Sequence, residues 1–276
     1  MDFESKVKET IKKYKLANKK DKIIVAMSGG KDSTTVAYLL NKLGFKIEAL
    51  HINLLMGKWS NKNLENVREF CKELKIKLHV YSIRDIVGYA MCYVKSVLKE
   101  KEKLRQCTVC GIIRRWIINK KARELKATRV ATGHNLDDEA QNVLMNFISG
   151  NPELGINLGP VTGSIKDKKF ILRIKPLYFL KEKEVEKYSK KMRFPVLYQR
   201  CPCVFGALRH KTRNKLDDLE KKNPKVKENL VKNFLKIKEK MRKSLKIKEL
   251  KYCKACGEPS RQEMCKACRM LKVIKK

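Results

Sequence analysis

The sequence predicts an α/β fold with a parallel β-sheet that has helices on both faces. Short apolar runs typical of strands alternate with longer stretches of helical periodicity, and this alternation is characteristic of parallel sheets. The 276 residues, of which 43% are hydrophobic, supply enough material for a substantial core. After residue 205 the chain becomes basic and helix-like, and residues 251–276 carry four cysteines. We therefore expect one large domain followed by two smaller parts.

The expected elements alternate along the first 150 residues. Strands are expected at residues 22–27, 46–52, 77–81 and 128–132. Helices are expected at residues 33–43, 60–74, 86–103, 111–126 and 136–149. Beyond them, residues 206–250 predict a helical extension with Pro224 as its main break. Since parallel sheets bind ligands beyond the carboxyl ends of their strands, the segments that follow the strands are the first candidates for function.

The charge of the chain points to a polyanionic partner. The formal net charge is +37, and a polyphosphate such as RNA or DNA would release many counterions on binding such a surface. A solvated, Lys-rich surface is the alternative explanation, and composition alone does not separate the two. There is no apolar run of transmembrane length and no signal-peptide core after the charged N-terminus, so we expect a cytoplasmic protein without a membrane partner.

A glycine-rich segment follows the first expected strand. The string SGGKDS at residues 28–33 lies between that strand and a helix. Its two glycines let backbone amides approach a ligand, and the helix directs the positive end of its dipole at the loop, so the segment predicts an anion cradle. The spacing is not that of a Walker A motif. An ordinary strand-to-helix turn is the alternative.

A second segment, GHNLDD at residues 133–138, follows the fourth expected strand and opens a helix. Asp137 and Asp138 fall in the first helical turn, where the dipole favours carboxylates. Capping of the helix by acidic residues is the alternative explanation for them.

The ten cysteines favour metal or redox chemistry, because disulfides are rare in the cytoplasm. Two C-x2-C pairs separated by eight residues fit a four-thiolate zinc site that would supply most of the folding energy of its small segment; they are Cys253, Cys256, Cys265 and Cys268. The pair Cys107 and Cys110 fits a redox dithiol, half a zinc site or part of an iron–sulfur site. Cys71 and Cys92 lie in apolar helical patterns and are expected in the core.

Together, these motifs resemble the PP-loop ATP pyrophosphatases, and among them the TtcA/TtuA-like tRNA 2-thiolation enzymes. The resemblance covers residues 20–205 and the terminal ribbon. Members cleave ATP between its α- and β-phosphates, adenylate a carbonyl oxygen of the substrate and release pyrophosphate. The resemblance implies a PP-loop domain of the HUP-like, adenine nucleotide alpha hydrolase-like class at residues 1–205, a basic helical extension at 206–250 and a four-cysteine zinc ribbon at 251–276.

The resemblance also implies roles for single residues. Lys31, Asp32 and Asp137 would act in catalysis; Asp32 would help to hold Mg²⁺, and Asp137 would be a metal ligand or would position the substrate. His134 would donate to the developing charge or be structural. The residues that would contact ATP are Ala26, Ser28, Gly29, Gly30, Lys31, Asp32, Ser33, Ile52, Arg114 and Gly133. Arg114 lies one helical turn beyond Cys110 and could couple the two sites; a surface arginine is the alternative.

In the same family a C-x2-C pair and one later cysteine hold a 4Fe–4S cluster, and Cys107, Cys110 and Cys201 match those positions. Three protein ligands leave one iron open to bind sulfide. Cys203 is either a fourth ligand, which would close the cluster, or a bystander; the register of Cys201 with Pro202 favours Cys201. A catalytic disulfide or persulfide between Cys110 and Cys201 is the competing chemistry.

The predicted function is an ATP-dependent tRNA 2-thiouridine synthase. The alternatives are a TtcA-like cytidine 2-thiolase, a PP-loop ligase or amidating enzyme, for which the cysteines have no purpose, and a non-enzymatic zinc-ribbon RNA-binding protein, which the intact residues 28–33 disfavour. The expected partners are tRNA and a sulfur donor, which would be inorganic sulfide, a persulfide carrier or a ubiquitin-like thiocarboxylate protein. By resemblance we expect a homodimer.

Overall fold

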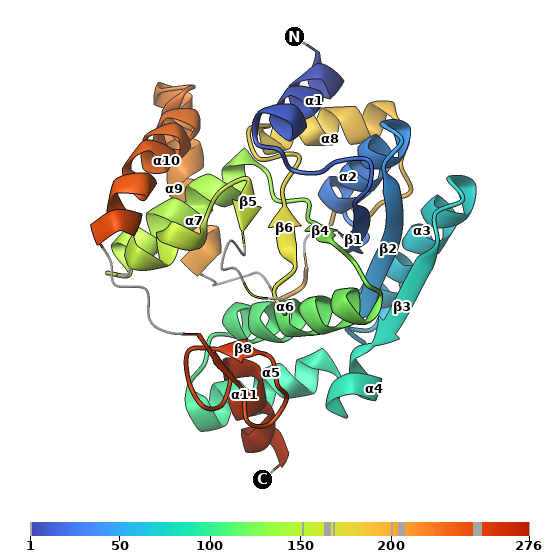
Figure 1. The fold of residues 1–276 in the computed structure, drawn as a ribbon, viewed down its shortest axis with the longest axis vertical. Coiled ribbons are helices and arrows are strands. Elements are labelled where there is room, and N and C mark those ends of the chain that lie inside the picture. The colour runs from blue at the N-terminus through green and yellow to red at the C-terminus, as the bar shows by residue number, and fades with distance from the viewer. Residues whose placement is uncertain are drawn as a thin grey trace.

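A six-stranded sheet in the order β3-β2-β1-β4-β6-β5 forms the centre of the computed structural model (Figure 1). The structure describes residues 2–150, 152–162, 167, 169–199, 201–203, 208–244 and 250–275. The strands are β1 (Lys22–Met27), β2 (Lys46–Asn53), β3 (Leu78–Ser82), β4 (Arg129–Ala131), β5 (Val161–Thr162) and β6 (Leu172–Ile174). All neighbouring pairs are parallel except β5 with β6. The predicted α/β class is confirmed. The strands β5 and β6 were not predicted, and β5 is an antiparallel edge strand of two residues.

The sheet is covered on both faces, and β1 shows why its sequence is apolar throughout. Ile23, Val25 and Met27 pack into one core, whereas Ile24 packs into the core of the opposite face. The first core contains residues of α1 (Phe3–Lys13), α2 (Lys31–Lys42), α3 (Lys58–Glu73) and α8 (Glu182–Lys191). The second contains residues of α4 (Ile83–Val87), α5 (Met91–Glu102) and α6 (Gln106–Glu124). Alternate side chains of one strand therefore stabilise two separate helical layers.

The C-terminal third adds two parts to this core, one beside α7 and one against α5 and α6 (Figure 1). Helices α9 (Leu208–Lys222) and α10 (Val226–Ser244) pack on α7 (Leu136–Ile148) around Leu216 and Val231, and the break between them contains Pro224 as predicted. A short turn of 3-10 helix, η1 (Pro152–Asn157), follows α7. The hairpin of β7 (Lys251–Tyr252) and β8 (Pro259–Ser260) precedes α11 (Lys266–Lys275), which packs on α5 and α6. The boundary expected at 205–206 lies outside the described residues, so the three-part division stays a prediction.

Two expected helix boundaries were wrong. The helix expected at 86–103 is two helices, because Gly88 adopts a φ of +90° and ends α4 before α5 begins at Met91. Helix α6 begins at Gln106, and not at residue 111, so the C-x2-C pair lies inside its first turns. Helices α1 and α8 were not expected.

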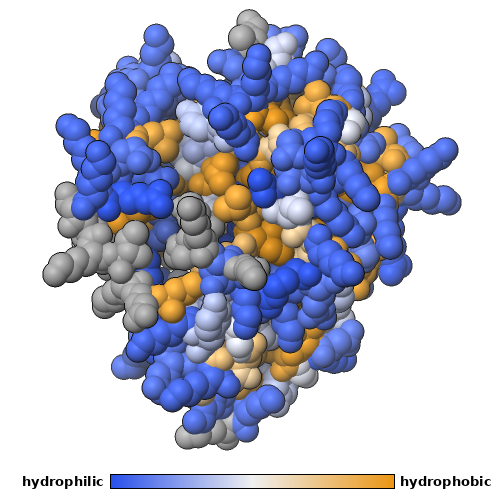
Figure 2. Space-filling model, viewed as in Figure 1, coloured by the Kyte–Doolittle hydropathy of each residue, from blue (hydrophilic) through white to orange (hydrophobic). Residues whose placement is uncertain are grey.

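The prediction for the two remaining cysteines was half right. Cys71 is 3% exposed, as expected of a core residue, and burial raises the pKa of its thiol to about 11. Cys92 is exposed, because α5 turns Met91, Val94 and Leu98 toward the core and leaves the next position outward. Hydrophilic side chains cover most of the face in Figure 2. Among the described helices, none is both long and apolar enough to cross a bilayer.

The buried His51 predicts a pH dependence of stability. Its Nδ1–H donates to the Met27 carbonyl at 3.0 Å, and burial lowers the pKa of the ring from 6.5 to about 4. The unfolded chain therefore binds a proton that the folded chain does not, and the free energy of unfolding falls as the pH drops from 6.5 toward 4. At about 1.4 kcal/mol per pKa unit, this loss is about 3 kcal/mol.

Urea unfolding of the wild type and His51→Gln between pH 7 and pH 4.5 measures this loss. The wild type should lose more stability over this range than the variant. Parallel stability curves for the two proteins would contradict a neutral, buried His51.

Candidate active site

The segment at residues 28–33 forms a compact loop between β1 and α2. Gly29 has a φ of +85°, and a Cβ there would lie 2.5 Å from Oδ1 of Asn63, so only glycine fits. The Ser28 amide donates to Oγ of Ser33 at 3.1 Å, and the Ser33 hydroxyl also contacts the Gly30 carbonyl at 3.1 Å. Gly30 caps α2 without any side-chain hydrogen bond. The first turn of α2 therefore presents its amides to the space beyond the loop, as an anion site requires.

The second motif lies directly against this loop. A Cβ on Gly133 would be 2.6 Å from the Ser33 amide nitrogen and 2.7 Å from the Asp32 carbonyl carbon. Asn135, which caps α7, donates from Nδ2 to Oδ1 of Asp32 at 3.1 Å. Gly133, expected beside the nucleotide, thus contacts the backbone of the loop itself.

Lys31 and Asp32 face a pocket beside the loop. Nζ of Lys31 is 3.2 Å from Oδ2 of Asp32 and 2.9 Å from Oε1 of Glu182, the first residue of α8. Burial raises the pKa of Asp32, although Lys31 opposes this effect. Asp137, Arg213 and other charged residues also line this pocket. A mixture of lysines and carboxylates around one space fits a site for a phosphate chain with its counter-cation.

Both oxygens of Asp137 already have partners. Oδ2 accepts from the Glu182 amide at 2.7 Å, and Oδ1 contacts Nζ of Lys227 at 2.5 Å. Lys227 is 2% exposed and also pairs with Asp217 and Glu220, at 2.6 and 2.8 Å. Its ammonium group thus lies between three carboxylates whose oxygens are within 4.8 Å of one another. This arrangement suits Asp137 to a positioning role.

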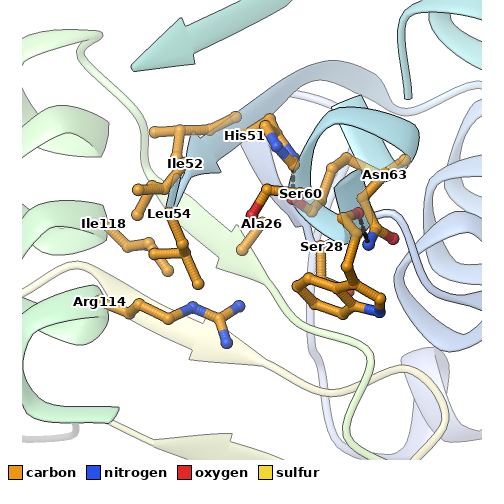
Figure 3. Close-up of a pocket in the computed structure, with 12 residues that line it drawn as sticks. Ala26, Ser28, His51, Ile52, Leu54, Ser60, Asn63, Arg114 and Ile118 are labelled. Atoms are coloured by element: carbon orange, nitrogen blue, oxygen red, sulfur yellow. Dashed lines mark hydrogen bonds between the residues drawn. The ribbon is translucent and has the colours of Figure 1, made fainter. Parts of the chain in front are cut away.

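A second pocket lies at the carboxyl ends of β1 and β2 and has about 450 Å³ of open space. The predicted residues Ala26, Ser28, Ile52 and Arg114 all line it. Figure 3 shows Arg114 reaching from α6 into this pocket, below Leu54. Within the described part of the chain, no carboxylate oxygen lies within 4.0 Å of that guanidinium group, so Arg114 is free to meet an anion.

His134 lies at the open side of the second motif. Its Nδ1 is 2.9 Å from the Thr132 hydroxyl. His134 is exposed at the surface, and desolvation by the surrounding atoms, followed by the nearby cations Lys175 and Arg209, lowers the pKa of its ring well below the ordinary value. The ring is therefore neutral at pH 7 and can serve only as a neutral hydrogen-bonding group.

The cysteines expected to hold a cluster come together from two segments. Cys107 and Cys110 lie in the first turns of α6, a helix whose first residue has no side-chain cap. The Cys107 thiol lies 3.8 Å from the Cys203 carbonyl. Cys110, Cys201 and Cys203 all pack against the core of α5 and α6. Burial raises the pKa of Cys201, although a hydrogen bond with the Cys203 backbone and the charge of Lys95 oppose this effect.

The terminal cysteines have the geometry of a single-ion site. The four sulfurs lie within 4.8 Å of one another; they belong to Cys253, Cys256, Cys265 and Cys268. The Cys265 amide donates to the Cys253 sulfur at 3.2 Å, and the Cys268 amide to the Cys265 sulfur at 3.4 Å. These residues fit Zn²⁺. Among the described residues, the thiols of Cys107, Cys110 and Cys201 do not form a group within 4.8 Å of one another.

Several residues of the two pockets were not predicted. Trp59 and Asn63 at the start of α3 and His51 of β2 line the pocket of Arg114. Glu182 and Lys227 complete the network around Lys31 and Asp137. The first three follow or end the second strand, which is the one signal that could have indicated them. No local signal marks the last two, which lie far along the chain from their partners.

Comparisons with known proteins agree with this geometry. The PP-loop domain family model matches residues 1–196. The tRNA-5-methyluridine(54) 2-sulfurtransferase of Pyrococcus horikoshii is 40% identical over 97% of this chain and 84% of its own length. Cytoplasmic tRNA 2-thiolation protein 1 of Caenorhabditis elegans is 31% identical over 98% of this chain and 72% of its own length.

A solved structure extends the match. The U34-tRNA thiolase NcsA from Methanococcus maripaludis, with its 4Fe-4S cluster, has a TM-score of 0.79 and 32% identity, and the match covers 98% of this chain and 86% of NcsA. On the extent of these matches, the chain belongs to the PP-loop family, among the tRNA 2-thiolation sulfurtransferases.

Proposed function

We propose that this protein is an ATP-dependent tRNA sulfurtransferase that converts one uridine to 2-thiouridine. The observation that carries the proposal is the position of α6. Its first turns hold Cys107 and Cys110. One turn later, Arg114 reaches into the pocket at the carboxyl ends of β1 and β2, which Ser28 also lines. The same helix therefore carries both the cysteines and a residue of the pocket next to the phosphate-binding loop. A reaction that couples ATP cleavage to sulfur transfer requires these two sites to lie close together.

The reaction has two steps in this proposal. The C2 oxygen of the uridine attacks the α-phosphorus of ATP, and pyrophosphate leaves. Sulfide then attacks C2, and the original oxygen departs within AMP. ATP is needed because the uridine oxygen is a poor leaving group until it is phosphorylated. The names of the relatives give position 54 or position 34 for the modified base. An experiment must therefore identify the position that this protein modifies.

The loop and its neighbours would bind and orient ATP. The amides of the first turn of α2 and Nζ of Lys31 would hold the pyrophosphate part, and Arg114 would reach a phosphate from the opposite wall. Asp32 is the carboxylate of the loop, and it would hold Mg²⁺, which neutralises phosphate charge when bound. Asp137, fixed by Lys227 and Glu182, would keep α7 and α8 in register with the loop.

Cys107, Cys110 and Cys201 would hold a 4Fe–4S cluster. When bound, such a cluster with three protein ligands supplies one iron with an open position for a sulfur nucleophile. The chain itself contributes the first turns of α6, which carry Cys107 and Cys110, together with an apolar wall from α5 and α6. The zinc ribbon packs against that wall through α11 and would keep it rigid.

The remaining expectations stay predictions. The sulfur donor would be inorganic sulfide, a persulfide carrier or a ubiquitin-like thiocarboxylate protein. The protein would work in the cytoplasm as a homodimer, and the basic residues of the C-terminal helices would contact the tRNA backbone.

Nucleoside mass spectrometry tests the function. Purified protein, unmodified tRNA, ATP, Mg²⁺ and sulfide should yield 2-thiouridine at one position, together with AMP and pyrophosphate in equal amounts. Omission of ATP is the control and should give no thionucleoside. Formation of 2-thiocytidine, or of a product without sulfur, would refute the uridine assignment.

The cluster ligands predict a contrast between two neighbouring cysteines. Cys201→Ala should lose the brown colour and the iron after anaerobic purification, because the third thiolate is gone. Cys203→Ala is the matched control and should keep both. Iron and sulfide analysis measures the difference, with zinc content as a check on folding. Loss of iron from Cys203→Ala alone would reverse the assignment, and zinc without iron in the wild type would end the cluster proposal.

Asp32 predicts a defect in the ATP step. Asp32→Asn removes the charge that would hold Mg²⁺ but keeps the size of the side chain, so pyrophosphate release should fall by about 100-fold or more. Asp85→Asn, at an exposed position of α4, should release pyrophosphate at the wild-type rate. Pyrophosphate is measured by a coupled assay in the presence of tRNA. Wild-type rates for Asp32→Asn would show that Asp32 holds no catalytic metal.

A further inference from the structure

Two arginine side chains meet beside α6, outside both pockets described above. Arg115 belongs to α6, and Arg173 belongs to β6. Nη2 of Arg173 donates to the Arg115 backbone carbonyl at 3.2 Å. The Arg115 side chain folds back along its helix, so that Nη1 lies 3.3 Å from the position of a Cβ on Gly111. The Arg173 guanidinium group therefore lies beside the middle of α6, and that of Arg115 extends back toward Gly111, the neighbour of Cys110.

These two charges have no acidic partner in the described part of the chain: no carboxylate oxygen there lies within 4.0 Å of either group. Their neighbours are different. Lys175 pairs with Glu139 at 2.7 Å, and Arg209 lies 3.7 Å from Asp138. Lys175 and Arg209 therefore have carboxylates near them, whereas Arg115 and Arg173 remain available to bind an anion.

The environment of the two arginines disfavours their positive charge. Burial, and then the charge of Arg115, lowers the pKa of Arg173 to about 10. Burial also lowers the pKa of Arg115, followed by the charges of Arg114 and Arg209. Like charges this close together repel one another unless an anion joins them.

We propose that Arg115 and Arg173 bind a phosphodiester group of the tRNA next to the nucleotide that enters the active site. The proposal rests on the proposed function, because it presumes a tRNA substrate. A planar guanidinium group binds phosphate oxygens through paired hydrogen bonds, so two of them suit one phosphodiester. The phosphates of ATP have other ligands in the loop at residues 28–33, and neither arginine lines a pocket of that loop.

The position of the two arginines indicates how a bound phosphate would help the reaction. A uridine inside a folded tRNA must leave its stack to reach a catalytic centre, and contacts to the neighbouring backbone hold it there. Arg115 lies five residues after Cys110 on the same helix. A phosphate bound here would therefore place the adjacent base between the cysteines and the second motif, where sulfur transfer would occur.

Binding of unmodified tRNA over a salt series tests the proposal, with the full-length protein purified anaerobically. Arg115→Gln and Arg173→Gln should each bind tRNA about tenfold more weakly near physiological salt. The slope of log K against log salt should fall in magnitude by about 0.7–0.9, as expected for one lost phosphate contact. Arg115→Lys should recover part of the affinity. Arg84→Gln, at an exposed position of α4, is the control and should match the wild type.

A second measurement locates the contact. A methylphosphonate at the phosphate beside the target uridine should weaken binding to the wild type but should add little to the defect of Arg115→Gln. Melting temperature, iron content and affinity for ATP should stay at wild-type values in the glutamine variants. Unchanged tRNA affinity and salt slope in both variants would overturn the proposal, and so would a loss of ATP affinity with tRNA binding intact.

The outcomes also separate this proposal from the function on which it rests. A wild type that binds tRNA but forms no thiouridine refutes the function, while the binding data on the arginines remain decisive. A wild type that thiolates tRNA, with glutamine variants that bind equally well, refutes the phosphate site alone.

Discussion

The parallel pairing of β1 with β4 is the constraint on which the active site depends. Ile23 pairs with Arg129 and Val25 with Ala131, so the segments that leave these two strands emerge side by side. Gly133 then contacts the backbone of the phosphate-binding loop so closely that no Cβ fits between them. Two motifs about a hundred residues apart in the sequence thus behave as one rigid surface, and any residue larger than glycine at position 133 would have to displace the loop.

A second constraint connects the C-terminal helices to this surface. The Lys227 ammonium group of α10 lies among Asp137, Asp217 and Glu220. Burial opposes its charge, but the three carboxylates raise the pKa of Lys227 above its ordinary value. Removal of one member of such a network leaves an uncompensated buried charge, which typically costs about 3–5 kcal/mol. The helices that would bind the RNA backbone therefore contact the second motif through Lys227. A displacement of these helices would also displace Asp137.

The sequence predicted elements whose cause is local, and it did not predict contacts whose cause is tertiary. β1 was predicted to the residue and β2 to within one residue, because the central strands of a covered sheet are rich in apolar residues. The loop at residues 28–33 and the zinc cysteines follow from spacing alone. Glu182 and Lys227 escaped prediction, because a salt bridge across many residues leaves no mark near either partner. Cys92 was misplaced for a related reason: its apolar neighbours showed that α5 has a buried face, but not which position turns outward.

The net charge of +37 has more than one physical meaning in this structure. An exposed lysine on a helix loses little free energy when it is solvated, so a basic surface alone says little about function. Lys175 and Lys227 are buried, and carboxylates neutralise their charge. Their ion pairs connect neighbouring elements of the fold. Arg114, Arg115 and Arg173 form a third class, because no carboxylate of the described chain lies within 4.0 Å of their guanidinium groups. Their positive charges disfavour one another in the free protein, and this repulsion is offset when an anionic ligand binds. The unpaired arginines beside α6 are therefore the part of the surplus charge that argues for a phosphate-bearing substrate.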